Sequence, residues 1–221
     1  MLIGGITCHS TFAPEIAGFM EKARAAMPFR DSVQWKHVKP KKVHVYKNVI
    51  DQFVEWNSEK LVDFHAVIIE KAARRDRIFN EGDSEKAYNK FLYQCLLAIH
   101  GRYRDARVIR CVHGNRESPY DLNEIKRMLN NKVGTAKNGF KAPYTELKYG
   151  DVSTTGPLQM ADLLLGAVGS FWNTKKKITN LARAEVASYF HSECCAERLT
   201  ASTPPSFRHF DIWKFRLKES P

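Results

Sequence analysis

The sequence predicts a single α/β domain that spans residues 1–221. Two patterns indicate this class. Short runs rich in β-branched and aromatic residues recur along the chain, and between them apolar residues recur every three or four positions. Strands that alternate with helices are typical of a sheet covered by helices. With 43% hydrophobic and 27% charged residues, the chain has the composition and length to bury one sizeable core.

The expected strands are short runs of strand-forming residues. A strand begins at once with Leu2–Thr7, and the run 61–69 contains Val67-Ile68-Ile69, which is typical of a central strand. Residues 209–217 alternate between polar and apolar side chains and predict a final edge strand. Further strands are expected at 106–112 and 143–149.

The expected helices have apolar residues at helical spacing and recognisable starts. Pro40 opens a long amphipathic helix, and Asp83 or Ser84 can cap the next one. Helices are expected at 14–27, 40–54, 84–99, 121–129, 156–168 and 181–195. The last helix and strand, about residues 178–218, form an extension of the domain.

The helix expected at 156–168 is apolar on every side except at Gln159 and Asp162. A helix of this kind is normally buried, where an uncompensated carboxylate is costly. The two polar side chains are three residues apart and share a face, which must look at a partner, a water-filled cleft or a metal ion. Asp162 is therefore the first candidate functional residue. The alternative is structural: Asp162 bonds a backbone amide or an arginine.

The chain is basic, with 35 Lys and Arg against 24 Asp and Glu, a net charge of +11. Such an excess favours polyanions, above all nucleic acid, as partners. Lys175, Lys176 and Lys177 follow the Asp162 helix and can track a phosphate backbone, unless they are a solvated loop favoured by the helix dipole. Arg116 follows an expected strand and lies beside a cleft or in a plain salt bridge.

Cysteine usage and hydropathy bear on location. The five cysteines form no CxxC pair and no even framework, and no signal peptide is present, which favours the cytoplasm. The helix at 156–168 is too short to span a bilayer, so no membrane association is expected.

Several segments follow one another in an order typical of a known family. They are the Gly4-Gly5 strand, Trp35-Lys36 with the helix from Pro40 to Phe53, and residues 63–69, 88–97, 122–130, 158–166 and 210–215. In this order they resemble the bacterial domain-of-unknown-function family 3800. The most specific part is the block from Leu158 to Gly166. The resemblance implies a ribonuclease H-like fold, with a mixed sheet flanked by helices.

This resemblance also implies a chemistry. Ribonuclease H-like enzymes bind two divalent metal ions with a cluster of carboxylates, and the metals activate water for phosphodiester hydrolysis. Asp162 would be a catalytic residue and a metal ligand, with Asp151 as a second ligand. Mg²⁺ or Mn²⁺ would be the cofactor. The protein would then be a nuclease.

The sequence departs from the family pattern at three places. The family opens with a strand that carries Asp-Glu-Ser and lies at the centre of the sheet. This strand is absent ahead of Leu2. Only Asp31 stands near a second acidic position, and Val112–Arg116 has no carboxylate where an aspartate is expected. His113 could replace one oxygen ligand.

These departures leave two alternatives: a fragment of a longer chain, or a degenerate member that no longer cleaves. A non-catalytic nucleic-acid-binding or partner-binding protein of the same fold is therefore the rival function. An open sheet edge also favours pairing with a second copy, so a homodimer is expected.

Overall fold

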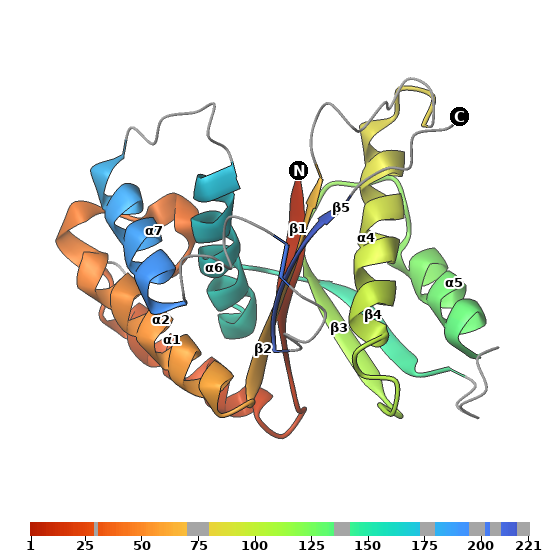
Figure 1. The fold of residues 1–221 in the computed structure, drawn as a ribbon, viewed down its shortest axis with the longest axis horizontal. Helices are drawn as coiled ribbons and strands as arrows, with labels where there is room; N and C mark the ends of the chain where they lie inside the picture. Colours follow the sequence, from red (N-terminus) through yellow and green to blue (C-terminus); the bar gives the residue numbers. More distant parts are fainter. Residues whose placement is uncertain are drawn as a thin grey trace. The chain divides into compact units, whose positions relative to one another are not determined.

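The computed structural model describes residues 1–28, 31–69, 80–134, 142–172, 180–194, 202–203 and 209–215. The chain divides into two compact units. The three-stranded unit comprises Leu2–Ile68 and Asp151–Lys214, and the two-stranded unit comprises Met1, Ile69–Gly150 and Phe215–Pro221. Helices and strands alternate along the chain (Figure 1), which confirms the α/β class.

The three-stranded unit is built on a sheet with the order β1-β2-β5. Its strands are β1 (Leu2–Cys8), β2 (Val62–Ile69) and β5 (Phe210–Phe215). β1 and β2 are antiparallel, with Leu2 opposite Ile68 and Cys8 opposite Val62. The central position of β2 and the edge position of β5 are those that the sequence predicts.

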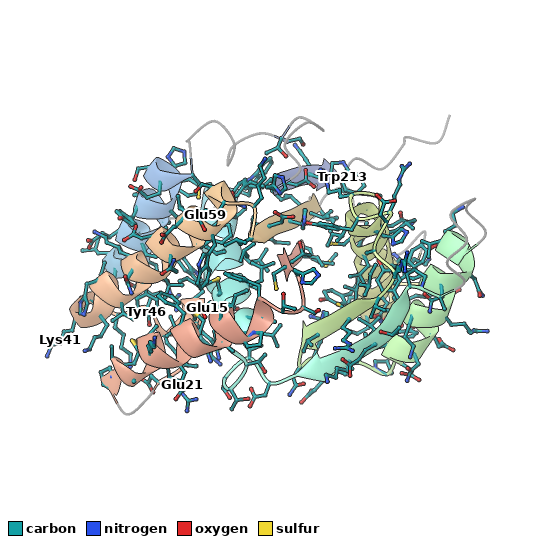
Figure 2. All side chains as sticks on the ribbon, turned by 90° about the horizontal axis from the view of Figure 1, so that it is seen from below. Glu15, Glu21, Lys41, Tyr46, Glu59 and Trp213 are labelled. Atoms are coloured by element: carbon teal, nitrogen blue, oxygen red, sulfur yellow. The ribbon has the colours of Figure 1, made fainter. Side chains whose placement is uncertain are left out.

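Helices cover one face of this sheet, and the core lies between the two layers (Figure 1). They are α1 (Ala13–Ala25), α2 (Val43–Ser58), α6 (Gly156–Trp172) and α7 (Leu181–Glu193), with the 3₁₀ turns η2 (Trp35–His37) and η3 (Pro40–Lys42) ahead of α2. Strand alternation turns Phe64 and Phe210 towards the helices, where both pack against Phe53 of α2. Figure 2 places Tyr46 within this layer, where its side chain is fully buried.

The two-stranded unit contains a parallel pair, β3 (Ile109–Gly114) and β4 (Tyr144–Gly150), with Gly114 opposite Gly150. Helix α5 (Leu122–Gly134) connects the two strands, and α4 (Ser84–His100) precedes them. The Tyr144 hydroxyl donates a hydrogen bond to the Leu96 carbonyl oxygen of α4 at 2.8 Å. The helices thus pack on one face of the pair, while Val112 and Lys148 on the other face are exposed.

Most element boundaries lie within a few residues of the expected ones, but α2 continues past Val54 to Ser58 and α5 continues past Leu129 to Gly134. The carboxylate of Asp83 caps α4, as expected, by accepting hydrogen bonds from the amides of Glu85 and Lys86. β3 runs to Gly114, because its pairing with β4 continues to Gly150. α6 continues past Val168 to Trp172. Among the helices that the structure describes, none has the length and apolarity that crossing a membrane requires.

The register of β1 on β2 generates a first prediction. A Cβ atom added to Gly4 would lie 2.2 Å from the His65 carbonyl oxygen and 2.8 Å from the Ala66 Cα, whereas one added to Gly5 would meet nothing within 4 Å. We expect Gly4→Ala to lower the free energy of unfolding by about 3 kcal/mol, because backbone atoms must move. Gly5→Ala should change it by less than about 1 kcal/mol. Urea unfolding followed by tryptophan fluorescence measures both, and equal effects would contradict this register.

Candidate functional site

The polar face of α6 binds the backbone of a segment that precedes α2, residues Ser32–Val38. The Gln159 side-chain oxygen accepts a hydrogen bond from the Val33 amide at 2.7 Å, and this glutamine is only 2% exposed. The Asp162 Oδ2 atom accepts one from the Trp35 amide at 2.8 Å. This is the backbone contact that the structural interpretation of Asp162 expected. Gln159 and Asp162 therefore both bind the backbone of Ser32–Val38.

Two more helices bind carbonyl groups of the same segment. Arg183 of α7 donates from Nε to the Trp35 oxygen at 3.1 Å and from Nη2 to the Lys36 oxygen at 2.6 Å. The Tyr46 hydroxyl of α2 donates to the His37 oxygen at 2.8 Å. Because Ser32–Val38 contains only a short 3₁₀ turn, side chains supply the hydrogen bonds that regular structure would give.

A glycine lets the segment approach α6 closely. A Cβ atom added to Gly166 would lie 2.1 Å from Cγ of Trp35 and 2.5 Å from its Cβ. The indole therefore occupies the space above Gly166, one helical turn beyond Asp162. The three α6 residues Gln159, Asp162 and Gly166 form one docking surface for Ser32–Val38.

The other acidic candidates are engaged locally. Asp151 accepts hydrogen bonds from the Ser153 amide at 2.8 Å and the Ser153 hydroxyl at 2.7 Å, and these bonds hold the pKa of Asp151 below its ordinary value. Asp31 lies 3.6 Å from the Lys39 ammonium. Across the described residues, no three His, Cys, Asp or Glu side chains come together in a group that could hold a metal ion. The residues described therefore do not fit a two-metal centre for Mg²⁺ or Mn²⁺.

Arg116 lies in the two-stranded unit, directly after β3, and is held by an ion pair. Its Nε donates to Oε2 of Glu85 at 2.9 Å, and its Nη2 donates to Oε1 of the same carboxylate. The guanidinium carbon lies 4.0 Å from the centroid of the Tyr88 ring. The pair lowers the pKa of Glu85. The plain salt bridge expected as an alternative is thus present, and it fixes the orientation of Arg116.

His113 uses both ring nitrogens within the unit. Nδ1 lies 2.6 Å from the Gly114 carbonyl oxygen, which only accepts hydrogen bonds, so Nδ1 carries the proton. Nε2 then accepts from the Tyr88 hydroxyl at 2.6 Å. Burial lowers the pKa of His113 and raises that of Tyr88 to about 12, so both are neutral at pH 7. With no lone pair left, His113 does not fit the role of a replacement metal ligand.

A shallow pocket of about 400 Å³ lies where the two parallel strands end. It is lined by Asn115, Arg116, Glu117 and Tyr149. The sequence analysis identified Arg116 but missed the other three. Their position at the carboxyl ends of neighbouring parallel strands is the signal that could have found them, because ligands of open α/β sheets bind there. Lys175, Lys176 and Lys177 lie outside the described residues.

Comparison with known proteins adds no relative. No protein-family model matches the chain, and no curated protein or solved structure is significantly similar to it.

The structural role of Asp162 can be tested by paired substitutions. Asp162→Ala leaves the Trp35 amide without its acceptor and should lower the free energy of unfolding by about 1–3 kcal/mol. Asp162→Asn keeps an oxygen acceptor and should cost less than about 1 kcal/mol. Urea unfolding of both variants distinguishes them. If neither variant lowered the free energy of unfolding, the hydrogen bond from Trp35 to Asp162 would not stabilise the fold.

The lowered pKa of His113 predicts a pH dependence of stability. The folded protein binds this proton more weakly than the unfolded chain, so the free energy of unfolding should fall as pH drops below about 6.5. His113→Gln should reduce the fall between about pH 7.5 and 5.5. Burial also lowers the pKa of His100. Because His100 is present in both proteins, its contribution to the pH dependence is the same in each. An unchanged pH profile of urea midpoints in the variant would contradict this assignment.

Proposed function

We propose that this chain is a nucleic-acid-binding protein of ribonuclease H-like architecture that binds by neutralising phosphates. The observation that carries this proposal is the uneven distribution of its positive charge. Of the 35 Lys and Arg, several are gathered in short runs of the sequence, such as Arg74, Arg75 and Arg77 and Lys175, Lys176 and Lys177. Charge gathered in a few short segments attracts a polyanion more strongly than the same charge spread evenly.

Three clusters are the candidates for phosphate contact. Arg74, Arg75 and Arg77 follow β2 in sequence, and Lys175–Lys177 follow α6. Between α4 and the middle of β3, Arg102, Arg104, Arg107 and Arg110 are accompanied by one acidic residue, Asp105. In this last cluster, Arg104, Arg107 and Arg110 are exposed.

Binding is better supported than cleavage because of how the acidic residues are used. Asp162 accepts the Trp35 amide, and Asp151 accepts two hydrogen bonds from Ser153. Carboxylates engaged in this way do not form the cluster of ligands that two metal ions need. Metal-dependent hydrolysis stays a prediction from the family resemblance. The ribonuclease H-like architecture also stays a prediction from the family resemblance, since the antiparallel and the parallel strand pair belong to two separate sheets in the described residues.

The salt dependence of binding tests the proposal. We expect labelled single-stranded and duplex oligonucleotides to bind with an affinity that falls steeply between about 50 and 200 mM salt. Replacing Lys175, Lys176 and Lys177 together by Gln should weaken binding and reduce the slope of log K against log salt by about 2. Fluorescence anisotropy measures both quantities. A flat salt response, or no binding at low salt, would contradict phosphate neutralisation.

A charge-matched variant and a cleavage assay complete this test. Lys22→Gln, Lys41→Gln and Lys60→Gln together remove the same charge from separate exposed positions and should change the slope little. Incubation with Mg²⁺ or Mn²⁺ should leave the oligonucleotides intact. Cleavage that Asp162→Asn abolishes would instead establish the nuclease.

A further inference from the structure

The pocket at the ends of β3 and β4 has the position of a ligand site. Asn115 and Arg116 directly follow the last residue of β3, and Tyr149 is the penultimate residue of β4. Both strands run in the same direction, so their carboxyl ends meet at one edge. Ligands of open α/β sheets bind at this edge, and the pocket there is shallow and open to solvent.

The pocket lining combines donors, acceptors and an aromatic ring. Arg116 supplies N–H donors, Glu117 supplies carboxylate acceptors, and the Asn115 amide supplies both kinds of group. A free phosphate or other small anion is a poor match, because Glu117 would repel it and Glu85 already neutralises Arg116. A flat, neutral group with donors and acceptors along its edge is the better match.

The side chains of Arg116 and Tyr149 are held in place before any ligand binds. The Glu85 carboxylate and the Tyr88 ring fix Arg116 from two directions. The Tyr149 ring packs edge-on against His113, with centroids 5.6 Å apart and an interplanar angle of 84°. The backbone N–H of Asn115 donates to the Gly150 carbonyl oxygen at 2.9 Å, which joins the two strand ends. Fixed groups lose little conformational entropy on binding.

We propose that this pocket binds one unpaired nucleobase of a single-stranded nucleic acid, and that this base is guanine. The inference rests on the proposed function and adds a substrate class to it. Guanine O6 and N7 can accept hydrogen bonds from the Nη1 group of Arg116, beside the bonds that Nε and Nη2 make to Glu85. The N1–H and N2–H groups of guanine can donate to one carboxylate, which Glu117 supplies. Its ring has a face that can stack on Tyr149. In a duplex, base pairing occupies the edge that Glu117 would bind, so single strands are preferred.

Oligonucleotides with one variable base test the proposal directly. We use the full chain with thymine oligomers of about 12 nucleotides that carry one central guanine, adenine or cytosine. The guanine oligomer should bind about tenfold more tightly than the all-thymine one, as measured by fluorescence anisotropy. Tyr149→Leu and Glu117→Gln should each abolish most of this preference. Tyr149→Phe keeps the ring and should retain it, and Glu124→Gln on α5 is the charge-matched control.

The outcomes separate this inference from the proposed function. Salt-sensitive binding without a preference for guanine, or a preference that Glu117→Gln leaves intact, would overturn the inference alone. Equal affinity for the adenine oligomer would overturn the assignment of guanine. If no oligomer binds, the proposed function fails, and guanosine is tested by saturation-transfer NMR. A signal that Glu117→Gln removes would then support the pocket, and the absence of any signal would overturn it.

Discussion

The backbone of Ser32–Val38 depends on side chains from three helices, and the three-stranded unit depends on that arrangement. Gln159 and Asp162 of α6 accept hydrogen bonds from its backbone amides. Arg183 of α7 and Tyr46 of α2 donate hydrogen bonds to its carbonyl oxygens. Each buried backbone group without a partner would cost about 1–3 kcal/mol. An aspartate in an otherwise apolar helix is thus explained by the Trp35 amide that it binds.

This constraint changes what the acidic residues mean for function. A carboxylate in apolar surroundings is a reasonable first candidate for catalysis, because perturbed groups gather at functional sites. Structural hydrogen bonds produce the same sequence pattern. Asp162 and Asp151 both accept hydrogen bonds from backbone amides. The better candidates for a functional role are therefore the basic clusters and the pocket beside Arg116.

Local sequence patterns predicted the elements well and their long-range contacts poorly. The apolar run Val67-Ile68-Ile69 identified β2 as a central strand, and Asp83 was one of two candidate caps, because these signals lie within a few residues. The spacing of Gln159 and Asp162 placed them on one face. Their partners could not be predicted, since Trp35 lies 127 residues away from Asp162 in sequence and carries no local mark of the contact. In the same way, Asn115 and Tyr149 line one pocket only because β3 and β4 pair in parallel.

Amide hydrogen exchange at Val33 and Trp35 tests the central claim most directly. Both amides should exchange far more slowly than in an unfolded chain, because each donates to a side chain of α6. In Asp162→Ala, exchange at Trp35 should accelerate while Val33, bound by Gln159, remains slow. Exchange at Trp35 that is fast in the parent protein, or that does not change in the variant, would contradict a structural role for Asp162.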